Sequence, residues 1–150
     1  SIGRTRGNRT VSNYAGDITP QEAWDILTTN PDARLVDVRT EAEWRFVGVP
    51  DTSSTEHEPL FIEWVTYPDG ERNFQFVSQL KEGGIEPGSE APVIFLCRSG
   101  QRSIGAAVAA TDAGIGPSYN VLEGFEGATN DEGHRGWQGW RAAGLPWRQG

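Results

Sequence analysis

The feature that most constrains this chain is residues 92–110, where an apolar run, a short polar loop and an Ala-rich run follow one another. The run Pro92-Val93-Ile94-Phe95-Leu96 predicts a buried strand, and residues 104–110, followed by Gly114, predict a helix and its end. The loop between them holds Cys97, the only cysteine of the chain. A loop that joins a strand to a helix aims backbone N–H groups, and the positive end of the helix dipole, at its centre. We therefore expect an anion-binding loop around the Cys97 sulfur.

Cys97 has two interpretations. A cysteine at the end of a buried strand is often a small core residue without a chemical role. Arg98 and Arg102 argue against that interpretation, because unpaired guanidinium groups are costly to bury. The Ser99-Gly100-Gln101 turn also leaves backbone amides free to close on an anion. Such surroundings favour a thiolate at neutral pH, so the loop predicts a nucleophile.

Segments in three parts of the chain resemble the rhodanese family of sulfurtransferases, and they occur in the family's order: Arg34 to Trp44, Cys97 to Arg102, and Asn120 to Phe125 followed by Gly139 to Pro146. The first is similar to the family's early Asp-Val-Arg motif, with acidic residues and then an aromatic residue. The second has the family's spacing between the cysteine and the arginine of its active-site loop. The third is similar to the C-terminal motif, in which Leu-Glu-Gly-Gly is followed by Gly-Trp and Ala-Gly-Leu-Pro. Phe125 stands where the family usually has its second glycine.

The resemblance implies an α/β fold with a mostly parallel central sheet and helices on both faces. It also implies a sulfurtransferase that moves a sulfane sulfur from thiosulfate, or a similar small anionic donor, through a Cys97 persulfide. The acceptor would be a thiol, cyanide or a protein, and no organic cofactor or metal is expected. The residues expected to bind the donor and the persulfide are Arg98, Ser99, Gly100, Gln101, Arg102 and Ser103.

Two other classes use the same fold. The active-site loop of rhodanese-like phosphatases and arsenate reductases resembles a His-Cys pair with the arginine one position later than in the sulfurtransferases. Here Leu96 precedes Cys97, and Arg102 comes one position too early for that pattern. A non-enzymatic sulfur carrier, or a module that binds one protein partner, would look the same in sequence. Activity toward small acceptors separates the carrier from the enzyme.

Composition and charge exclude several other classes of function. The chain has 150 residues, two distant histidines and a formal net charge of -8. Its length favours one domain, residues 14–150, preceded by a polar tail at 1–13, for which an arm reaching a second subunit is the alternative. One thiol and two histidines give no metal cluster, and an acidic chain does not suit nucleic acid or an anionic membrane. With no apolar run near the roughly 20 residues of a membrane span and no signal sequence, we expect a cytoplasmic protein.

Local patterns place the elements around the loop. Thr19 with Glu22, and Thr40 with Glu43, predict capped helix starts. Residues 34–38 and 118–122 predict strands, and residues 73–81 predict a helix with one apolar face at Phe76, Val77 and Leu80. Asp37 and Arg39 follow a strand where sites form, but the resemblance implies that they hold the fold together by charge pairing.

Two segments depart from the family, residues 48–73 and 128–138. The first contains a turn at Pro68-Asp69-Gly70, with aromatic residues on both sides that favour a packed hairpin, and a solvated His57. Because parallel strands end at one edge of a sheet, both segments leave the edge that holds Cys97. We expect them to form the pocket wall, through Trp64, His134, Arg135 and Trp137. The alternatives are that they lengthen the fold or contribute to a homodimer contact.

Overall fold

A computed structural model describes residues 14–53, 55, 57–65, 71–98, 100–127 and 139–148. Three predictions lie outside the described residues: the tail at 1–13, the turn at 68–70 and the course of residues 128–138. The two sides of that turn are described, and Val65 pairs with Arg72 in an antiparallel bridge as a hairpin requires.

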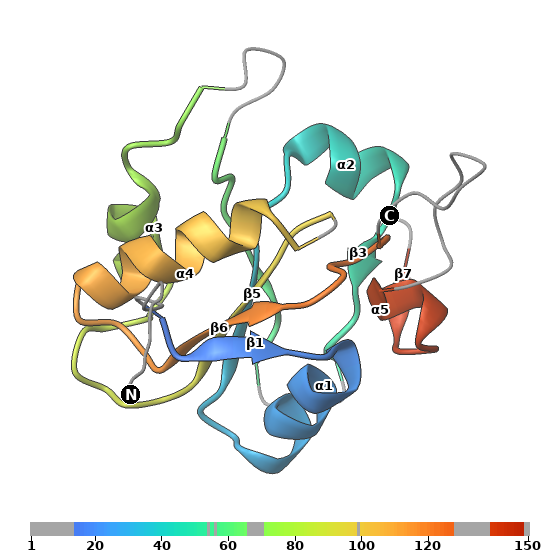
Figure 1. Ribbon diagram of the computed structural model, residues 1–150, viewed down its shortest axis with the longest axis horizontal. Helices are drawn as coiled ribbons and strands as arrows, with labels where there is room; N and C mark the ends of the chain where they lie inside the picture. Colours follow the sequence, from blue (N-terminus) through green and yellow to red (C-terminus); the bar gives the residue numbers. More distant parts are fainter. Residues whose placement is uncertain are drawn as a thin grey trace, which may run out of the picture.

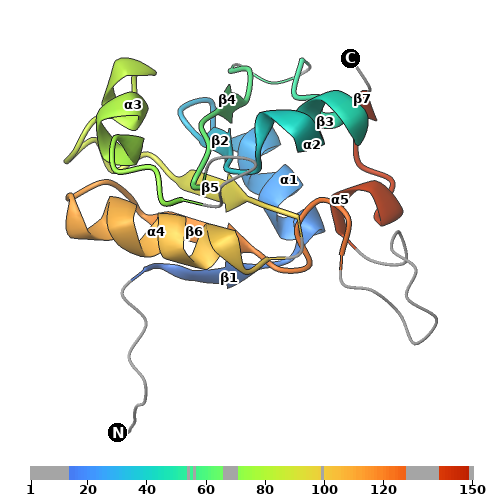
Figure 2. The same cartoon turned by 90° about the horizontal axis from the view of Figure 1, so that it is seen from above.

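The centre of the fold is a parallel sheet. Its five strands lie in the order β1-β6-β5-β2-β4 (Figure 2), and every described pairing between them is parallel. Their bounds are β1 Gly16–Ile18, β2 Arg34–Asp37, β4 Leu60–Phe61, β5 Val93–Leu96 and β6 Ser118–Val121. A separate antiparallel pair joins β3 (Val49–Pro50) to β7 (Trp147–Arg148). The strand that precedes Cys97 is therefore central, with neighbours on both sides.

Helices cover both faces of this sheet. In Figure 1, α3 (Phe76–Glu82) and α4 (Arg102–Asp112) lie above the strands, and α1 (Pro20–Thr29) lies below them. The short α5 (Gly139–Ala142) packs with α1, and α2 (Glu41–Phe46) follows β2. The arrangement confirms the predicted α/β class, with a mostly parallel sheet and helices on both faces.

The two helix starts predicted from capping patterns are confirmed. Thr19 accepts the backbone N–H of Glu22, whose side chain accepts the N–H of Thr19 in return. Thr40 and Glu43 make the same reciprocal pair at the start of α2. Each pair satisfies two N–H groups that the first turn of a helix leaves without intrahelical partners.

The third predicted helix begins later than residue 73. Asn73 instead belongs to the connection that precedes α3: its backbone N–H donates to the Trp64 carbonyl. Its side chain donates to the carbonyl of Glu63 and to the side chain of Gln79. Because these bonds fix Asn73 outside the helix, α3 begins at Phe76, while Phe76 and Leu80 form its buried face as expected.

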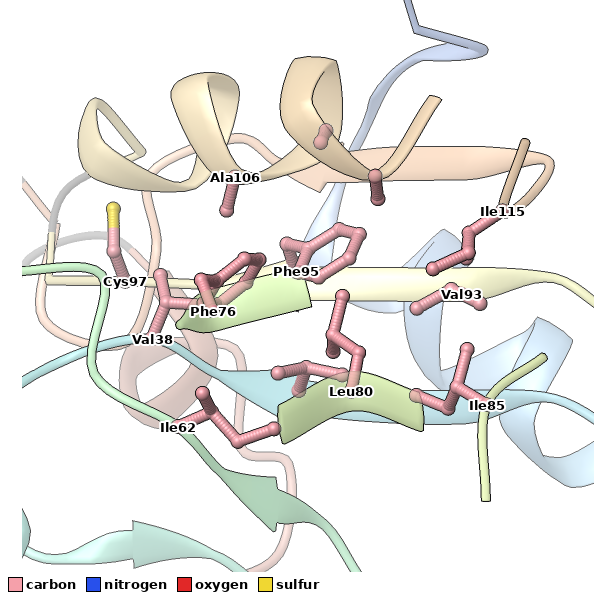
Figure 3. Close-up of a cluster of buried hydrophobic side chains, with 13 residues drawn as sticks. Val38, Ile62, Phe76, Leu80, Ile85, Val93, Phe95, Cys97, Ala106 and Ile115 are labelled. Atoms are coloured by element: carbon pink, nitrogen blue, oxygen red, sulfur yellow. The ribbon is translucent and has the colours of Figure 1, made fainter. Parts of the chain in front are cut away.

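The alternation of β5 divides the core in two. Val93, Phe95 and Cys97 face α3 and α4 in one buried cluster, whereas Ile94 and Leu96 face α1 and α5 in the other. Figure 3 shows the first cluster, with Cys97 at the carboxyl end of β5 beside the start of α4. Both faces of this strand are buried, which explains its unbroken apolar sequence. Within the described residues, no helix combines the length and apolar character that crossing a membrane requires.

Candidate active site

Cys97 lies where β5 ends and the loop to α4 begins, and it is 1% exposed. Its sulfur accepts the backbone N–H of Gly100 at 3.1 Å and lies 3.2 Å from the Ser103 hydroxyl oxygen. Gly100 has a φ of +96°, and a Cβ on it would lie 3.1 Å from the backbone nitrogen of Glu123. Gln101 makes no side-chain capping bond, so the first turn of α4 keeps N–H groups for an anion. The backbone N–H of Gly100 thus points at the sulfur from the loop.

Arg102 is not a free cation. Its guanidinium donates to both carboxylate oxygens of Glu43, at 2.8 and 2.9 Å, across from the first turn of α2. These hydrogen bonds raise the pKa of Arg102; burial opposes them, and the charges of Glu43, Cys97 and Asp37 add to them. Arg102 is therefore within electrostatic reach of the Cys97 sulfur, while its own charge is compensated by a carboxylate.

Arg98 also has a carboxylate partner. Its Nε lies 3.4 Å from an oxygen of Glu126, and the Arg98 side chain is 46% exposed. Both arginines that the sequence places in the Cys97 loop therefore have a carboxylate partner. The two carboxylates come from α2 and from the loop after β6, far from the arginines in the sequence.

The loop after β6 supports the loop that holds Cys97. The N–H of Phe125 donates to the Cys97 carbonyl at 2.7 Å, and the N–H of Glu126 donates to the Arg98 carbonyl at 2.9 Å. Gly124, at a φ of +60°, makes this approach possible, because a Cβ there would lie 2.6 Å from the carbonyl carbon of Arg98. Phe125, which stands where the family has a glycine, is fully buried below this contact. The third sequence motif thus fixes the backbone of the second.

Asp37 and Arg39 have the structural role that the resemblance implied. Both are completely buried, and the Arg39 guanidinium donates to both Asp37 oxygens and to the carbonyl of Gly48. The guanidinium also lies 4.2 Å from the centre of the Phe125 ring. This buried ion pair links the end of β2 to β3 and to the loop after β6.

A chain of side chains leads from the sulfur to the edge of the sheet. The Ser103 hydroxyl donates to Oδ1 of Asn120, whose Nδ2 donates to Asp17 at 3.0 Å. The Tyr14 hydroxyl donates to the same oxygen of Asp17 at 2.8 Å. Asp17 and Asn120 are register partners on β1 and β6, and Asn120 is paired with Phe95 of β5. The sequence alone does not indicate this chain, because only the strand register brings its members together.

Trp64 is the one predicted wall residue that the structure describes. It follows β4, packs edge-on against Phe76 at 5.1 Å between ring centres, and borders the buried cluster that contains Cys97. A Cβ on Gly105 of α4 would lie 2.9 Å from the Trp64 ring. Trp64 therefore lies on the helix that begins at the Cys97 loop. Of the other predicted site residues, Ser99, His134, Arg135 and Trp137 lie outside the described residues.

His57 is exposed, as predicted, and lies away from this constellation; its backbone carbonyl accepts the hydroxyls of Thr52 and Thr55. The residues that sequence reasoning missed are Glu43, Asn120, Asp17, Gly124 and Glu126. Glu43 gave a local signal for a helix cap, but nothing local to it indicated Arg102 as its partner.

Fold and site together define a class: an α/β protein whose lone cysteine opens a loop between a central parallel strand and a helix. The chain belongs to the Rhodanese-like domain family, whose sequence model matches residues 19–131.

Among solved structures, the chain is similar to Rv0390 from M. tuberculosis, with 63% identity and a TM-score of 0.84 over 91% of this chain and 99% of that one. It shares the fold of the polysulfide-sulfur transferase homodimer from Wolinella succinogenes, with 22% identity and a TM-score of 0.61 over 92% of this chain and 80% of that one. Curated relatives include the "Uncharacterized protein RP600 homolog" of Rickettsia rickettsii, 38% identical over 88% of this chain and 96% of the relative.

Proposed function

We propose that this protein is a sulfurtransferase that carries a sulfane sulfur on Cys97, with thiosulfate or a similar small anion as the donor. The observation that carries the proposal is the geometry at the sulfur, which accepts the Gly100 N–H at 3.1 Å at the start of α4. Membership of the Rhodanese-like domain family supports it. The chemistry requires a nucleophilic sulfur whose negative charge is stabilised before and after transfer, and N–H donors at a helix start supply that.

The reaction has two half-reactions. The Cys97 thiolate attacks the outer sulfur of thiosulfate, a new S–S bond forms, and the bond to the sulfonate sulfur breaks with its electron pair leaving on sulfite. The Cys97 persulfide that remains carries one negative charge. An acceptor such as cyanide then attacks the terminal sulfur, which leaves as thiocyanate and returns the thiolate. Splitting the transfer through a covalent intermediate is nucleophilic catalysis.

The residues of the loop have separate roles in this proposal. Backbone amides between Arg98 and Ser103 bind the charged terminal sulfur, with Gly100 already aimed at the site. Arg102 orients the donor's sulfonate from the position in which Glu43 holds it, and Arg98 contributes from its exposed position. Trp64, whose ring lies against Gly105 of α4, forms part of the pocket wall.

The test is the intact mass of the protein after incubation with thiosulfate, and again after addition of cyanide, alongside a thiocyanate assay. Because the chain has one cysteine, added sulfur has one thiol on which to reside. We expect a gain of one sulfur atom that cyanide removes as thiocyanate. Cys97→Ser should show no gain and keep the fold, whereas Arg102→Ala should mainly weaken the use of an anionic donor. Retained sulfur loading in Cys97→Ser, or no loading of a reactive wild-type thiol by thiosulfate, contradicts the proposal.

A further inference from the structure

The hydrogen-bond chain below Cys97 has a fixed direction. The carboxylate of Asp17 only accepts hydrogen bonds, so the amide nitrogen of Asn120 faces it at 3.0 Å. The amide oxygen of Asn120 must then face Ser103 and can only accept. The Ser103 hydroxyl proton therefore points toward the amide oxygen of Asn120. A lone pair of the Ser103 oxygen then faces the Cys97 sulfur, 3.2 Å away.

The burial of Ser103 and Asn120 gives the direction of these hydrogen bonds an energetic effect on Cys97. Ser103 is fully buried and Asn120 is 1% exposed, so water does not supply a replacement partner for either. In the thiol form, the Cys97 S–H donates to Ser103 and every group in the chain is satisfied. In the thiolate form, the Ser103 lone pair faces an anion. The hydroxyl must turn toward the sulfur, and the buried oxygen of Asn120 then loses its donor, which is unfavourable.

We propose that Asn120, fixed by Asp17, is a positioning residue that points the Ser103 hydroxyl away from Cys97 and so holds the resting nucleophile as a thiol. This inference rests on the sulfurtransferase function proposed above and adds a control of its first step. Loss of the proton to water, followed by rotation of the Ser103 hydroxyl onto the sulfur, produces the attacking thiolate.

Other charges also act on the sulfur, and the test must keep them constant. Among the described residues, the charged groups that the contacts above connect to this site are Arg102, Glu43, Asp37, Arg39, Arg98, Glu126 and Asp17. The elements packed around Cys97 also carry Asp112 on α4, Glu41 and Arg45 on α2, Lys81 and Glu82 on α3, Arg34 on β2 and Glu123 in the loop after β6. Substituting Asn120 changes none of them, which makes it the cleanest position for the experiment.

The experiment is the pH profile of thiolate formation, followed by ultraviolet absorbance, with the profile of Cys97→Ser subtracted so that only the single cysteine contributes. Asn120→Leu has a side chain of similar shape that cannot accept the Ser103 proton. We expect its midpoint to move about one pH unit lower than wild type, because the freed hydroxyl donates to the thiolate. In a Ser103→Ala background, Asn120→Leu should produce no such shift.

A second variant covers the case in which Asn120→Leu does not fold. Asp17 is exposed, and Asp17→Ala releases the Asn120 amide to turn its nitrogen toward Ser103, which again frees the hydroxyl for the sulfur. The shift in Asp17→Ala should exceed that in Asp17→Ala/Ser103→Ala, where only the lost negative charge acts. Tyr14→Phe is the matched control, since it removes a hydrogen bond to Asp17 but leaves the carboxylate, and its profile should match wild type.

Two outcomes overturn the inference: an unchanged midpoint in folded Asn120→Leu, or equal shifts with and without Ser103. A purely structural role of Asn120 would change the unfolding free energy without a Ser103-dependent shift. Since the readout uses no sulfur donor, a failure of this inference and a failure of the sulfurtransferase proposal are told apart by separate measurements.

Discussion

At the scale of single residues, Glu43 joins two functions that the sequence shows separately. Its carboxylate accepts a hydrogen bond from the backbone N–H of Thr40 at the start of α2. It also accepts one from each of the two terminal guanidinium nitrogens of Arg102 at the start of α4. Burial alone would raise the pKa of this carboxyl. The hydrogen bonds and charge of Arg102, together with Thr40, outweigh burial and lower the pKa from the ordinary 4.5 to about 2. Glu43 is therefore ionised in the folded protein at pH values where it is protonated in the unfolded chain.

This difference predicts an acid-dependent stability. A carboxyl whose pKa is lowered on folding stabilises the protein above its unfolded value of 4.5, and that contribution is lost as the pH falls toward about 2. We expect Glu43→Gln to lower the unfolding free energy near neutral pH by about 1 kcal/mol, since the side chain is partly exposed. The difference from wild type should shrink between pH 4.5 and 2, as measured by urea unfolding across that range.

Glu41→Gln is the control, because it makes the same change in the same first turn at an exposed position. It should leave the acid slope of wild type unchanged. A gap between Glu43→Gln and wild type that persists undiminished to pH 2 would show that Glu43 does not act through its ionised form.

The residues that the sequence predicted well are those whose partners are close in the chain. The Thr40–Glu43 cap joins residues three positions apart, so local chemistry indicates it. The Asp37–Arg39 pair joins residues two positions apart, and the resemblance to the family implied it. Arg102 and Glu43 are 59 positions apart, and only the topology brings them together. Cys97 was predictable for another reason: the apolar strand, the polar loop and the small-residue helix identify its place without any distant partner.

At the scale of elements, the nucleophile loop depends on the loop after β6. Gly124 allows the two backbones to approach, and its Cβ would contact the Arg98 carbonyl. We expect Gly124→Ala to displace the loop and to lower the rate of sulfur loading at least about tenfold. It should also lower the unfolding free energy by more than the roughly 1–2 kcal/mol that left-handed backbone strain alone would cost. The measurements are loading kinetics by mass and urea unfolding.

Gly144→Ala separates the two effects. Gly144 also has a positive φ, +78°, but a Cβ there meets nothing within 4 Å. Its substitution should carry the backbone strain alone and keep the loading rate. If Gly124→Ala and Gly144→Ala lose stability equally and both load sulfur at the wild-type rate, the contact between the loops does not position Cys97.

Elements with strong patterns were predictable, and short ones were not. The strand before Cys97 and the helix after it follow from periodicity and composition, and α4 begins at Arg102, within the predicted loop. The antiparallel pair of β3 and β7 has two residues on each side, too few for any alternation to show. The predicted start of α3 at residue 73 was wrong, because the side chain of Asn73 makes hydrogen bonds that hold it in the preceding connection.

At the scale of the whole molecule, parallel topology decides which residues share an edge. Cys97, Thr40 and Leu122 each follow a strand of one parallel sheet, so their loops converge although they are widely separated in the sequence. This convergence was predictable from the alternation of strands and helices. The pairing of both loop arginines with carboxylates was not, and it changes the electrostatic expectation, because the loop carries less net positive charge than its sequence suggests.

The charge of the whole chain then governs the approach of an anionic donor. The formal net charge is -8, the loop arginines are compensated, and thiosulfate is a dianion, so the long-range interaction is repulsive. Raising sodium chloride from about 0.01 to 0.15 M shortens the Debye length from about 30 to 8 Å and screens that repulsion. We expect the second-order rate constant of sulfur loading to rise about threefold over this range, as measured by mass at limiting thiosulfate. Alkylation of Cys97 by the uncharged reagent iodoacetamide is the control and should not change. A loading rate that falls with salt would instead mean that a local positive field at the Cys97 loop dominates the approach, and that the carboxylate partners of Arg98 and Arg102 do not neutralise it.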